Sequence, residues 1–342
     1  MIIGKAPLRM SFLGGGTDLP SYYRKFGGLV VSTSIDKYVF VAINPKFDER
    51  LRVSYSVTEN VNHSGELKHP LVKTALELKN IRGGVEITSI ADIPSGGTGL
   101  GSSSSFTVCL LQVLSAYNGE FCTPQDFAET ASHIEINLCG EPIGKQDQYA
   151  AAFGGLNMIE FHQDDSVQVT PVVCNQEYLH KFERQTLCFY TGRTRSASDI
   201  LQEQSARSRD DQIVIDSLNA LKNLARDFVK SLYAGDMQAM GSILHEGWIL
   251  KRGLSANITD TAIDRHYETA RNEGAYGGKL LGAGGGGFLM VQAPEERHDA
   301  IVRALSGLRP VSLPFSTEGS RIIFYHPPKN GYLKGKPTNG QM

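Results

Sequence analysis

Apolar residues recur along this 342-residue chain at two spacings, and each spacing predicts one kind of element. Apolar stripes with members three and four residues apart predict helices, whereas short runs rich in β-branched and aromatic residues predict strands. The most regular stripe ends at an Asn-Gly pair, and its members are Phe106, Cys109, Leu110, Val113, Leu114 and Tyr117. A buried helix is therefore predicted in the middle of the first half of the chain.

The elements predicted around this helix indicate an α+β fold. In the first half, strands are expected at residues 2–13, 30–43, 51–56 and 85–90, with 51–56 pairing back on the first two and a short helix at 71–79. A Thr-Pro-Gln-Asp sequence at residues 123–126 has the form of a helix start, and this helix is expected to run to about residue 137. Strands are expected to follow near residues 156–161 and 167–173.

The second half also alternates strands and helices. Strands are predicted at 187–191, 288–293, 311–315 and 321–325, and helices at 211–234, at 260–273 and from residue 294. The long helix has one apolar face, made of Val214, Leu218, Leu221, Ala225, Phe228 and Leu232. A shift in composition near residues 170–185 indicates a domain boundary between the two halves.

The turn before the central helix has the composition of an anion-binding loop. Residues 94–105 read Pro-Ser-Gly-Gly-Thr-Gly-Leu-Gly-Ser-Ser-Ser-Ser. Glycines let backbone N–H groups approach a ligand, and a helix N-terminus adds unpaired N–H groups and the positive end of the helix dipole. The Walker A motif is excluded because Ser102 stands where that motif requires Lys. A flexible linker is disfavoured because an apolar helical stripe follows at once, and the hydroxyl groups suit Mg²⁺ shared with phosphate.

Three segments in order resemble the motifs of the GHMP kinases. The glycine loop is similar to the second motif of that family, residues 6–18 (Ala-Pro-Leu-Arg-Met-Ser-Phe-Leu-Gly-Gly-Gly-Thr-Asp) to the first, and residues 279–288 (Lys-Leu-Leu-Gly-Ala-Gly-Gly-Gly-Gly-Phe) to the third. The resemblance implies a ribosomal-protein-S5-like, ATP-binding domain at residues 1–175, a ferredoxin-like α/β-plait domain at 176–330 and a flexible tail at 331–342. The third segment also matches a dinucleotide fingerprint, but it follows a helix and precedes a strand, so NAD is rejected.

The resemblance also implies roles for particular residues. Asp147 corresponds to the general base of the family, Arg9 to a basic residue directed at the transferred phosphate, and Ser103 and Glu135 to the Mg²⁺ ligands. Lys145 lies two residues from Asp147 and is a further catalytic candidate. The expected nucleotide-binding residues are Gly96, Gly97, Gly99, Leu100, Gly101, Ser102, Ser103 and Ser104, and the expected substrate-binding residues are Asp18, Gly15, Gly16, Thr17, Gly284, Gly285 and Gly286.

Each assignment has a structural alternative that the sequence leaves open. Glu135 could be an exposed helix carboxylate, Asp147 the N-cap of the segment after it, and Lys145 a solvated surface lysine. Arg9 and Asp18 could form an ion pair with each other. The last glycine loop could be a plain turn, although four consecutive glycines exceed what a turn needs.

Two further features of the resemblance point to a sugar acceptor. Residues 14–18 read Gly-Gly-Gly-Thr-Asp where galactokinase has Gly-Glu-His-Thr-Asp, and residues 144–155 and 190–197 resemble the heptose 7-phosphate kinases and the kinase part of fucokinase. The expected reaction is ATP-dependent phosphorylation of O1 of D-glycero-α-D-manno-heptose 7-phosphate, toward nucleotide-activated heptose for surface polysaccharide. Arg193 and Arg195, just before an expected helix start, are predicted to clamp the substrate's own phosphate. The alternatives are another GHMP kinase, of the fucose or mevalonate type, and a non-catalytic sugar sensor.

Composition and charge argue against several classes of partner and site. A net charge of −2 and the lack of any long run of like charges argue against a nucleic-acid partner. Five cysteines without a C-x-x-C pair argue against a disulfide framework or a zinc site. With neither a signal peptide nor a membrane-length apolar run, a cytoplasmic enzyme is expected. Its expected ligands are ATP, Mg²⁺ and a small sugar phosphate, and the formation of a homodimer is left open.

Overall fold

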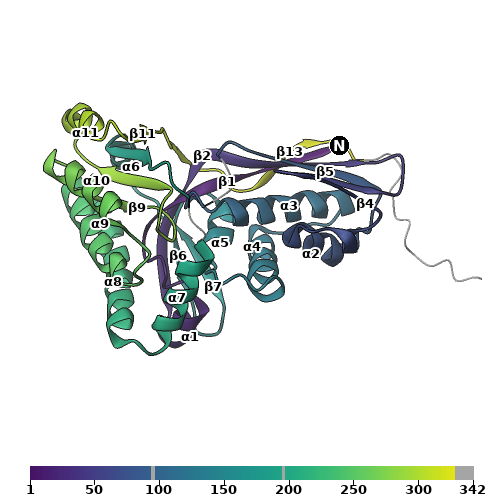
Figure 1. Ribbon diagram of the computed structural model, residues 1–342, viewed down its shortest axis with the longest axis horizontal. Coiled ribbons are helices and arrows are strands. Elements are labelled where there is room, and N and C mark those ends of the chain that lie inside the picture. The colour runs from purple at the N-terminus through teal and green to yellow at the C-terminus, as the bar shows by residue number, and fades with distance from the viewer. Residues whose placement is uncertain (94–96, 195–196, 328–342) are drawn as a thin grey trace, which may run out of the picture.

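The computed structural model describes residues 1–93, 97–194 and 197–327, which form two sheets with helices packed against them (Figure 1). The strands of the first sheet within these residues are β1 (Ile2–Leu13), β2 (Gly28–Pro45), β3 (Leu51–Ser54), β4 (Thr58–Val61), β5 (Val85–Ala91), β6 (Leu156–Phe161), β7 (Val167–Pro171), β12 (Phe315–Ser316) and β13 (Arg321–Tyr325). Their main path is β13-β1-β2-β5-β3-β4, while β6 and β12 pair with β2, and β7 pairs with β6.

The long antiparallel pair β1 and β2 forms the centre of this sheet, from Ile2 opposite Ile43 to Leu13 opposite Val31. The strand β3 pairs with β4 and, in parallel, with β5. The prediction that residues 51–56 pair back on the first two strands was therefore wrong. The reason is that β5, which comes later in the chain, takes the place beside β2 and separates it from β3.

Helices of the first half cover one face of this sheet (Figure 1). They are α2 (Pro70–Leu78), α3 (Ser102–Asn118), α4 (Pro124–Ser132) and α5 (Gln146–Phe153), with the short turn η1 (Ser64–Glu66) before α2 and the helix α1 (Pro20–Phe26) after β1. In the predicted apolar stripe of α3, Phe106 and Tyr117 are partly buried and the other four residues are buried. The predicted capping box of α4 forms between Thr123 and Asp126. The π-helical segment η2 (His133–Leu138) continues α4 and carries Glu135.

The second sheet consists of β8 (Thr186–Tyr190), β9 (Gly277–Leu280), β10 (Phe288–Gln292) and β11 (Arg309–Pro310). The spatial order is β11-β8-β10-β9, and all neighbours are antiparallel. Counted within the sheet this order is 4-1-3-2, as in a ferredoxin-like plait, so the predicted architecture of the second half is confirmed.

Helices of the second half are α6 (Gln176–Arg184), α7 (Ala197–Asp210), α8 (Gln212–Ala234), α9 (Met237–Arg252), α10 (Thr261–Asn272) and α11 (His298–Ala304), with the turn η3 (Glu295–Arg297) before α11. The sequence predicted α8, α10 and α11, but it did not predict α6 or α9, and for α7 only a start. Within the described part of the chain, no helix combines the length and the hydropathy that crossing a bilayer requires.

The end of the chain returns to the first sheet. β12 pairs with β2 and β13 with β1, so residues 315–325 belong to the first sheet although the range 176–330 was assigned to the second domain. The strand predicted at 311–315 is replaced by the two short strands β11 and β12. The domain bounds remain a prediction, and the tail at 331–342 lies outside the described residues.

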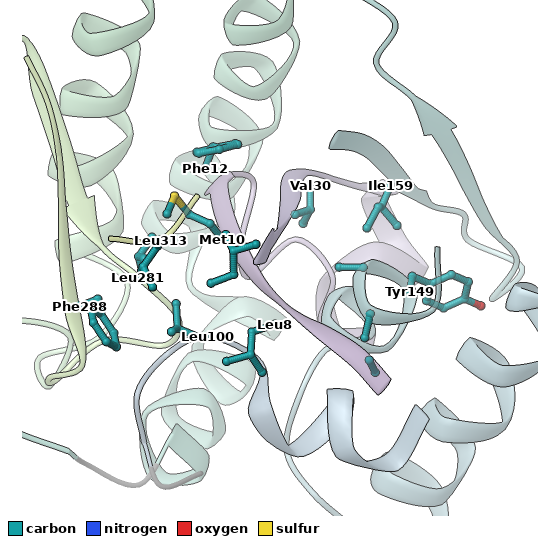
Figure 2. Packing of buried hydrophobic residues seen from close by; sticks show 14 of the residues in the cluster. Leu8, Met10, Phe12, Val30, Leu100, Tyr149, Ile159, Leu281, Phe288 and Leu313 are labelled. Carbon is teal, nitrogen blue, oxygen red and sulfur yellow. The ribbon is translucent and has the colours of Figure 1, made fainter. Parts of the chain in front are cut away.

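An apolar core joins the two halves at the end of β1 (Figure 2). The ring centroid of Phe12 lies 5.3 Å from that of Phe182, 5.4 Å from Phe228 and 5.9 Å from Phe315. The four rings come from different segments, and burial of Phe12, Phe182 and Phe228 contributes roughly 1.5–3 kcal/mol each to stability, while Phe315 is partly buried. This packing holds β1, which carries the first glycine-rich motif, against the second half of the chain.

Candidate active site

A cavity of about 280 Å³ opens where β1, the N-terminus of α3 and the second half of the chain meet. All three glycine-rich segments line it: Gly15, Gly16 and Asp18 from the first, Gly97, Gly99, Gly101, Ser102, Ser103 and Ser104 from the second, and Gly282 and Ala283 from the third. The second and third segments touch, since a Cβ added to Gly99 would lie 2.3 Å from the carbonyl oxygen of Leu281. Motifs from opposite ends of the described chain, at residues 6–18 and 279–288, therefore build one site.

Arg9 and Asp147 form a bidentate ion pair on the wall of this cavity. Arg9 Nε donates to Asp147 Oδ1 and Nη2 donates to Oδ2, both at 2.8 Å, while Nη1 donates to the carbonyl of Gly99 at 2.6 Å. The Arg9 side chain is 5% exposed and that of Asp147 23%. Asp147 lies in the first turn of α5 and is not its N-cap, so the predicted structural alternative for this residue was wrong. Its carboxylate is held in one orientation and remains accessible from the cavity.

The N-terminus of α3 presents hydroxyl and backbone donors to the cavity. Gly99 and Gly101 have φ angles of +78° and +77°, which a non-glycine residue rarely adopts, and they turn the chain into the helix. Ser102 Oγ is buried at the cavity and has no hydrogen-bond partner among the described residues. An unsatisfied buried hydroxyl at a helix N-terminus is suited to an anionic ligand.

Ser103 and Glu135 lie together at the same end of the cavity. Ser103 Oγ donates to Glu135 Oε1 at 3.0 Å, and Gln148 Nε2 donates to Oε2. Glu135 is 1% exposed, so the alternative of a solvent-exposed helix carboxylate is excluded. Burial raises the pKa of its carboxyl group, and the hydrogen bonds from Ser104, Gln148 and Ser103 oppose that rise.

Asp18 also lines the cavity. Its Oδ1 accepts from the backbone N–H of Gly16 at 2.9 Å, and its Oδ2 accepts from that of Gln146 at 3.3 Å. Burial raises the pKa of Asp18, and the nearby charge of Asp147 raises it further. Asp18 does not pair with Arg9, which rules out the surface ion pair considered from the sequence.

The lining residues that the sequence did not identify include two lysines and a glutamine. Lys251 of α9 and Lys279 of β9 are 6% and 4% exposed. Lys251 Nζ donates to the carbonyl of Gly282, and Lys279 Nζ donates to those of Ser11 and Phe12. Gln204 of α7 is 2% exposed, and its Nε2 has no hydrogen-bond partner within the described residues. A buried polar residue on the apolar face of a helix would have been the signal for Lys251, but α9 itself was not predicted.

Several predicted site residues lie elsewhere. Lys145 Nζ donates to the carbonyl of Asp165 at 3.1 Å and lies over the ring of Tyr23, so it does not reach Asp147 or the cavity. Thr17 Oγ1 donates to two backbone carbonyls, those of Gly14 and Leu29, and stabilises the turn instead of facing the cavity. Both assignments are corrected for that reason.

The other corrections concern the third motif and the arginines. Arg193 Nη1 donates to Asp260 Oδ2 at 2.7 Å outside the cavity lining, so the predicted phosphate clamp lacks this residue. Gly284, Gly285 and Gly286 pack against Ile258 and Arg193 and do not line the cavity. The side chain of Leu100 is part of the apolar core (Figure 2). Gly96 and Arg195 fall outside the described residues.

Comparison with protein families identifies both halves of the chain. Residues 69–155 match the GHMP kinases N terminal domain, and residues 228–308 match the GHMP kinases C terminal domain. The chain belongs to the GHMP kinase family. The match confirms the resemblance drawn from the three motifs, and it makes the chain an ATP-dependent phosphotransferase.

Sugar kinases are among the relatives of this GHMP kinase. A Campylobacter jejuni protein named D-glycero-alpha-D-manno-heptose 7-phosphate kinase is 28% identical over 313 residues, which cover 88% of this chain and 92% of the relative. An Arabidopsis thaliana bifunctional fucokinase/GDP-fucose pyrophosphorylase is 25% identical over 84% of this chain and 29% of its own length. A solved D-glycero-D-manno-heptose 1-phosphate kinase from Bacteroides thetaiotaomicron superposes with a TM-score of 0.79 at 26% identity, covering 95% of this chain and all of that one.

The donor set of the cavity fits a nucleotide phosphate and a magnesium ion. The N-terminus of α3 and the unpartnered hydroxyl of Ser102 supply donors for phosphate oxygens. Ser103 and Glu135 supply two oxygen ligands of the kind that Mg²⁺ prefers. No cluster of three or more His, Cys, Asp and Glu side chains suited to a metal occurs in residues 1–93, 97–194 and 197–327. A metal at this pair would therefore complete its coordination with phosphate oxygens and water.

Proposed function

We propose that this GHMP kinase transfers the γ-phosphoryl group of ATP to the anomeric O1 of D-glycero-α-D-manno-heptose 7-phosphate, giving the 1,7-bisphosphate for nucleotide-activated heptose. The observation that carries the proposal is that the Arg9–Asp147 pair, the Ser103–Glu135 pair and Asp18 line one cavity, in which the charge of Asp147 acts on both Glu135 and Asp18. Phosphoryl transfer needs the acceptor hydroxyl in line with the bond that breaks at the γ-phosphorus and within reach of a proton acceptor, and these groups supply the parts for it.

In this proposal each group has one task. The N-terminus of α3 binds the phosphates of ATP, and Ser103 and Glu135 would hold a Mg²⁺ ion that would neutralise part of the phosphate charge. The acceptor oxygen forms a bond to the γ-phosphorus while the bond from that phosphorus to the β,γ-bridging oxygen breaks. The proton of the acceptor hydroxyl passes to the carboxylate of Asp147, and ADP leaves. Arg9 fixes the orientation of Asp147 through its two hydrogen bonds.

Asp18 is the proposed sugar ligand. Its carboxylate is held by two backbone N–H groups and faces the same cavity as Asp147. A carboxylate has two oxygens that each accept hydrogen bonds, so it suits two neighbouring sugar hydroxyls. The names of two relatives support a heptose phosphate but place the existing phosphate differently, at position 7 in one name and at position 1 in the other. The position of transfer is therefore the point that needs an experiment.

The test is ADP release over a panel of acceptors, with Mg²⁺ and ATP saturating. The panel contains heptose 7-phosphate, heptose 1-phosphate, unphosphorylated heptose, fucose, galactose and mevalonate. The Asp147→Asn variant serves as the control for contaminating kinases. We expect the highest kcat/KM with heptose 7-phosphate and a product whose phosphorus NMR signal is that of an anomeric phosphate. A preference for fucose or mevalonate would replace this acceptor by another one of the family, and ATP binding without turnover on any acceptor would indicate a sugar sensor.

A further inference from the structure

Among the described residues, Arg9, Lys251 and Lys279 are the cations that line the cavity, and their partners differ. Arg9 is paired with Asp147, and Lys279 donates to two carbonyl groups. Lys251 Nζ has one hydrogen-bond acceptor in the described part of the chain, the carbonyl of Gly282, and no carboxylate within ion-pair distance there. An ammonium group has three donors. Lys251 therefore has two unused donors and Lys279 has one, and neither ammonium is paired with a carboxylate of the described residues.

The position of Lys251 is set by the contact between two glycine loops. A Cβ added to Gly282 would lie 2.3 Å from the Cα of Gly99, and the carbonyl of Gly99 accepts from Arg9. The ammonium held by Gly282 thus lies beside the loop that leads into α3 and near the Arg9–Asp147 pair. The charges of Arg9, Asp18 and Asp147 all act on it, so it lies near the proposed base and the proposed sugar ligand.

A buried ammonium without a counter-ion is unfavourable in the free protein. Burial is the main reason that the pKa of Lys251 is lowered to about 8, and the neighbouring Arg9 lowers it further against the opposing effect of Asp18 and Asp147. Stability alone would favour an apolar side chain at this position of α9. A bound anion that uses the free N–H groups would remove the penalty, and a phosphoryl group is the anion that a kinase brings to this point.

We propose that Lys251 is a binding residue for the phosphoryl group in transfer, contacting the γ-phosphate of ATP from the side of the second domain. The proposal rests on the chain acting as a kinase and does not depend on which acceptor is used. It gives the transferred group a cation of its own, because Arg9 already has Asp147 as its partner. It also explains why the third glycine motif is in contact with the second: Gly282 positions the ammonium against the loop that leads into α3.

The test compares the affinities of Mg·ATP and Mg·ADP by calorimetry in wild type, Lys251→Met and a matched control, Lys222→Met. Lys222 of α8 also donates to backbone carbonyls, those of Phe26 and Gly27, and burial also lowers its pKa, but it does not line the cavity. We expect Lys251→Met to weaken ATP binding by about 10-fold or more and ADP binding by less than 2-fold, since only ATP carries the γ-phosphate. Lys222→Met should leave both affinities unchanged.

Turnover and stability separate a binding role from a structural one. With the best acceptor of the panel, Lys251→Met should lower kcat by about 10²-fold, because the contact is strongest when charge moves in transfer. Its unfolding midpoint should stay equal to that of wild type or rise, since a buried charge is removed. Equal changes in ATP and ADP affinity, or a lowered unfolding midpoint with an unchanged affinity ratio, would overturn the proposal. A panel without any turnover would refute the kinase function, while the ATP-to-ADP ratio would still decide whether Lys251 contacts the γ-phosphate.

Discussion

We expect that substitutions in the Arg9–Asp147 pair separate the contribution of Asp147 to stability from its contribution to catalysis. In Asp147→Asn the side chain keeps its shape, but one acceptor becomes an N–H donor that faces an N–H of Arg9. A hydrogen bond to a charged group contributes about 1.5–3 kcal/mol, and the partial exposure of Asp147 reduces its share. We expect the free energy of unfolding to fall by about 2 kcal/mol. Loss of the proton acceptor should lower kcat by about 10²-fold or more.

The second variant removes the buried charge as well. In Arg9→Met combined with Asp147→Asn, no unpaired guanidinium remains in the protein interior, and replacement of a buried ion pair by apolar groups is often close to neutral. The double variant should therefore recover most of the lost stability, to within about 1 kcal/mol of wild type. Its kcat should stay as low as that of Asp147→Asn, because the proton acceptor is still absent.

Urea denaturation and steady-state kinetics at saturating sugar measure the two effects on the same preparations. A kcat of Asp147→Asn within about 3-fold of wild type would refute the assignment of Asp147 as the base, since general-base catalysis contributes 10²–10⁴ in rate. A double variant that regains activity together with stability would show that Asp147 acts only as the partner of Arg9. Tight ADP binding in both variants serves as the control for an intact nucleotide site.

The remaining predictions concern the proposed metal ligands Ser103 and Glu135, the close contact at Gly99, and the buried ammonium group of Lys251. Ser103→Ala and Glu135→Gln should each raise the Mg²⁺ concentration for half-maximal activity, and unchanged titrations in both would contradict the metal site. Gly99→Ala should lower the free energy of unfolding by about 2 kcal/mol, because the new Cβ would lie 2.3 Å from the carbonyl oxygen of Leu281 and the backbone φ angle is +78°. The control Gly307→Ala should change the free energy of unfolding little, because a Cβ there would meet no atom within 4 Å. Since Lys251 has a pKa of about 8 and is protonated below it, kcat/KM should fall as the pH rises through about 8. Lys251→Met should lack this decline, and identical pH profiles would argue against the role of the ammonium.

The spacing of apolar residues predicted the helices that pack through one regular apolar face. The apolar residues of α3 and α8 repeat every three and four positions, and both helices form as predicted. The helix α9 was missed because its packing needs glycine: a Cβ on Gly241 would lie 2.2 Å from Cβ of Tyr276, and one on Gly247 would lie 2.4 Å from a methyl group of Leu13. Glycine lowers helix propensity, so the two glycines that allow this close packing made residues 237–252 look less helical in the sequence.

The sequence predicted the glycine-rich loops of the candidate site, but it did not predict which side chains of the site pair with one another. Glycines at close contacts are visible in a sequence because few other residues fit, which is why the loops at Gly99 and Gly282 stood out. The pairing of Arg9 with Asp147 joins residues 138 positions apart and depends on how β1 lies beside α5. Nothing in either segment alone indicates that the two side chains meet.

The same limit explains why the sequence analysis assigned Arg193 to the substrate phosphate. Arg193 precedes a helix start, and a local argument assigns its charge to an anion at that end of the helix. In the folded chain Asp260 of the α10 N-cap neutralises it, whereas Lys251, in an unpredicted helix, reaches the cavity without a carboxylate partner. A cation is available to a ligand only when no protein anion has paired with it, and this is a property of the tertiary structure. Burial and pairing together, rather than proximity to a motif, therefore identify Lys251 as a cation that the second half of the chain offers to a ligand in this cavity.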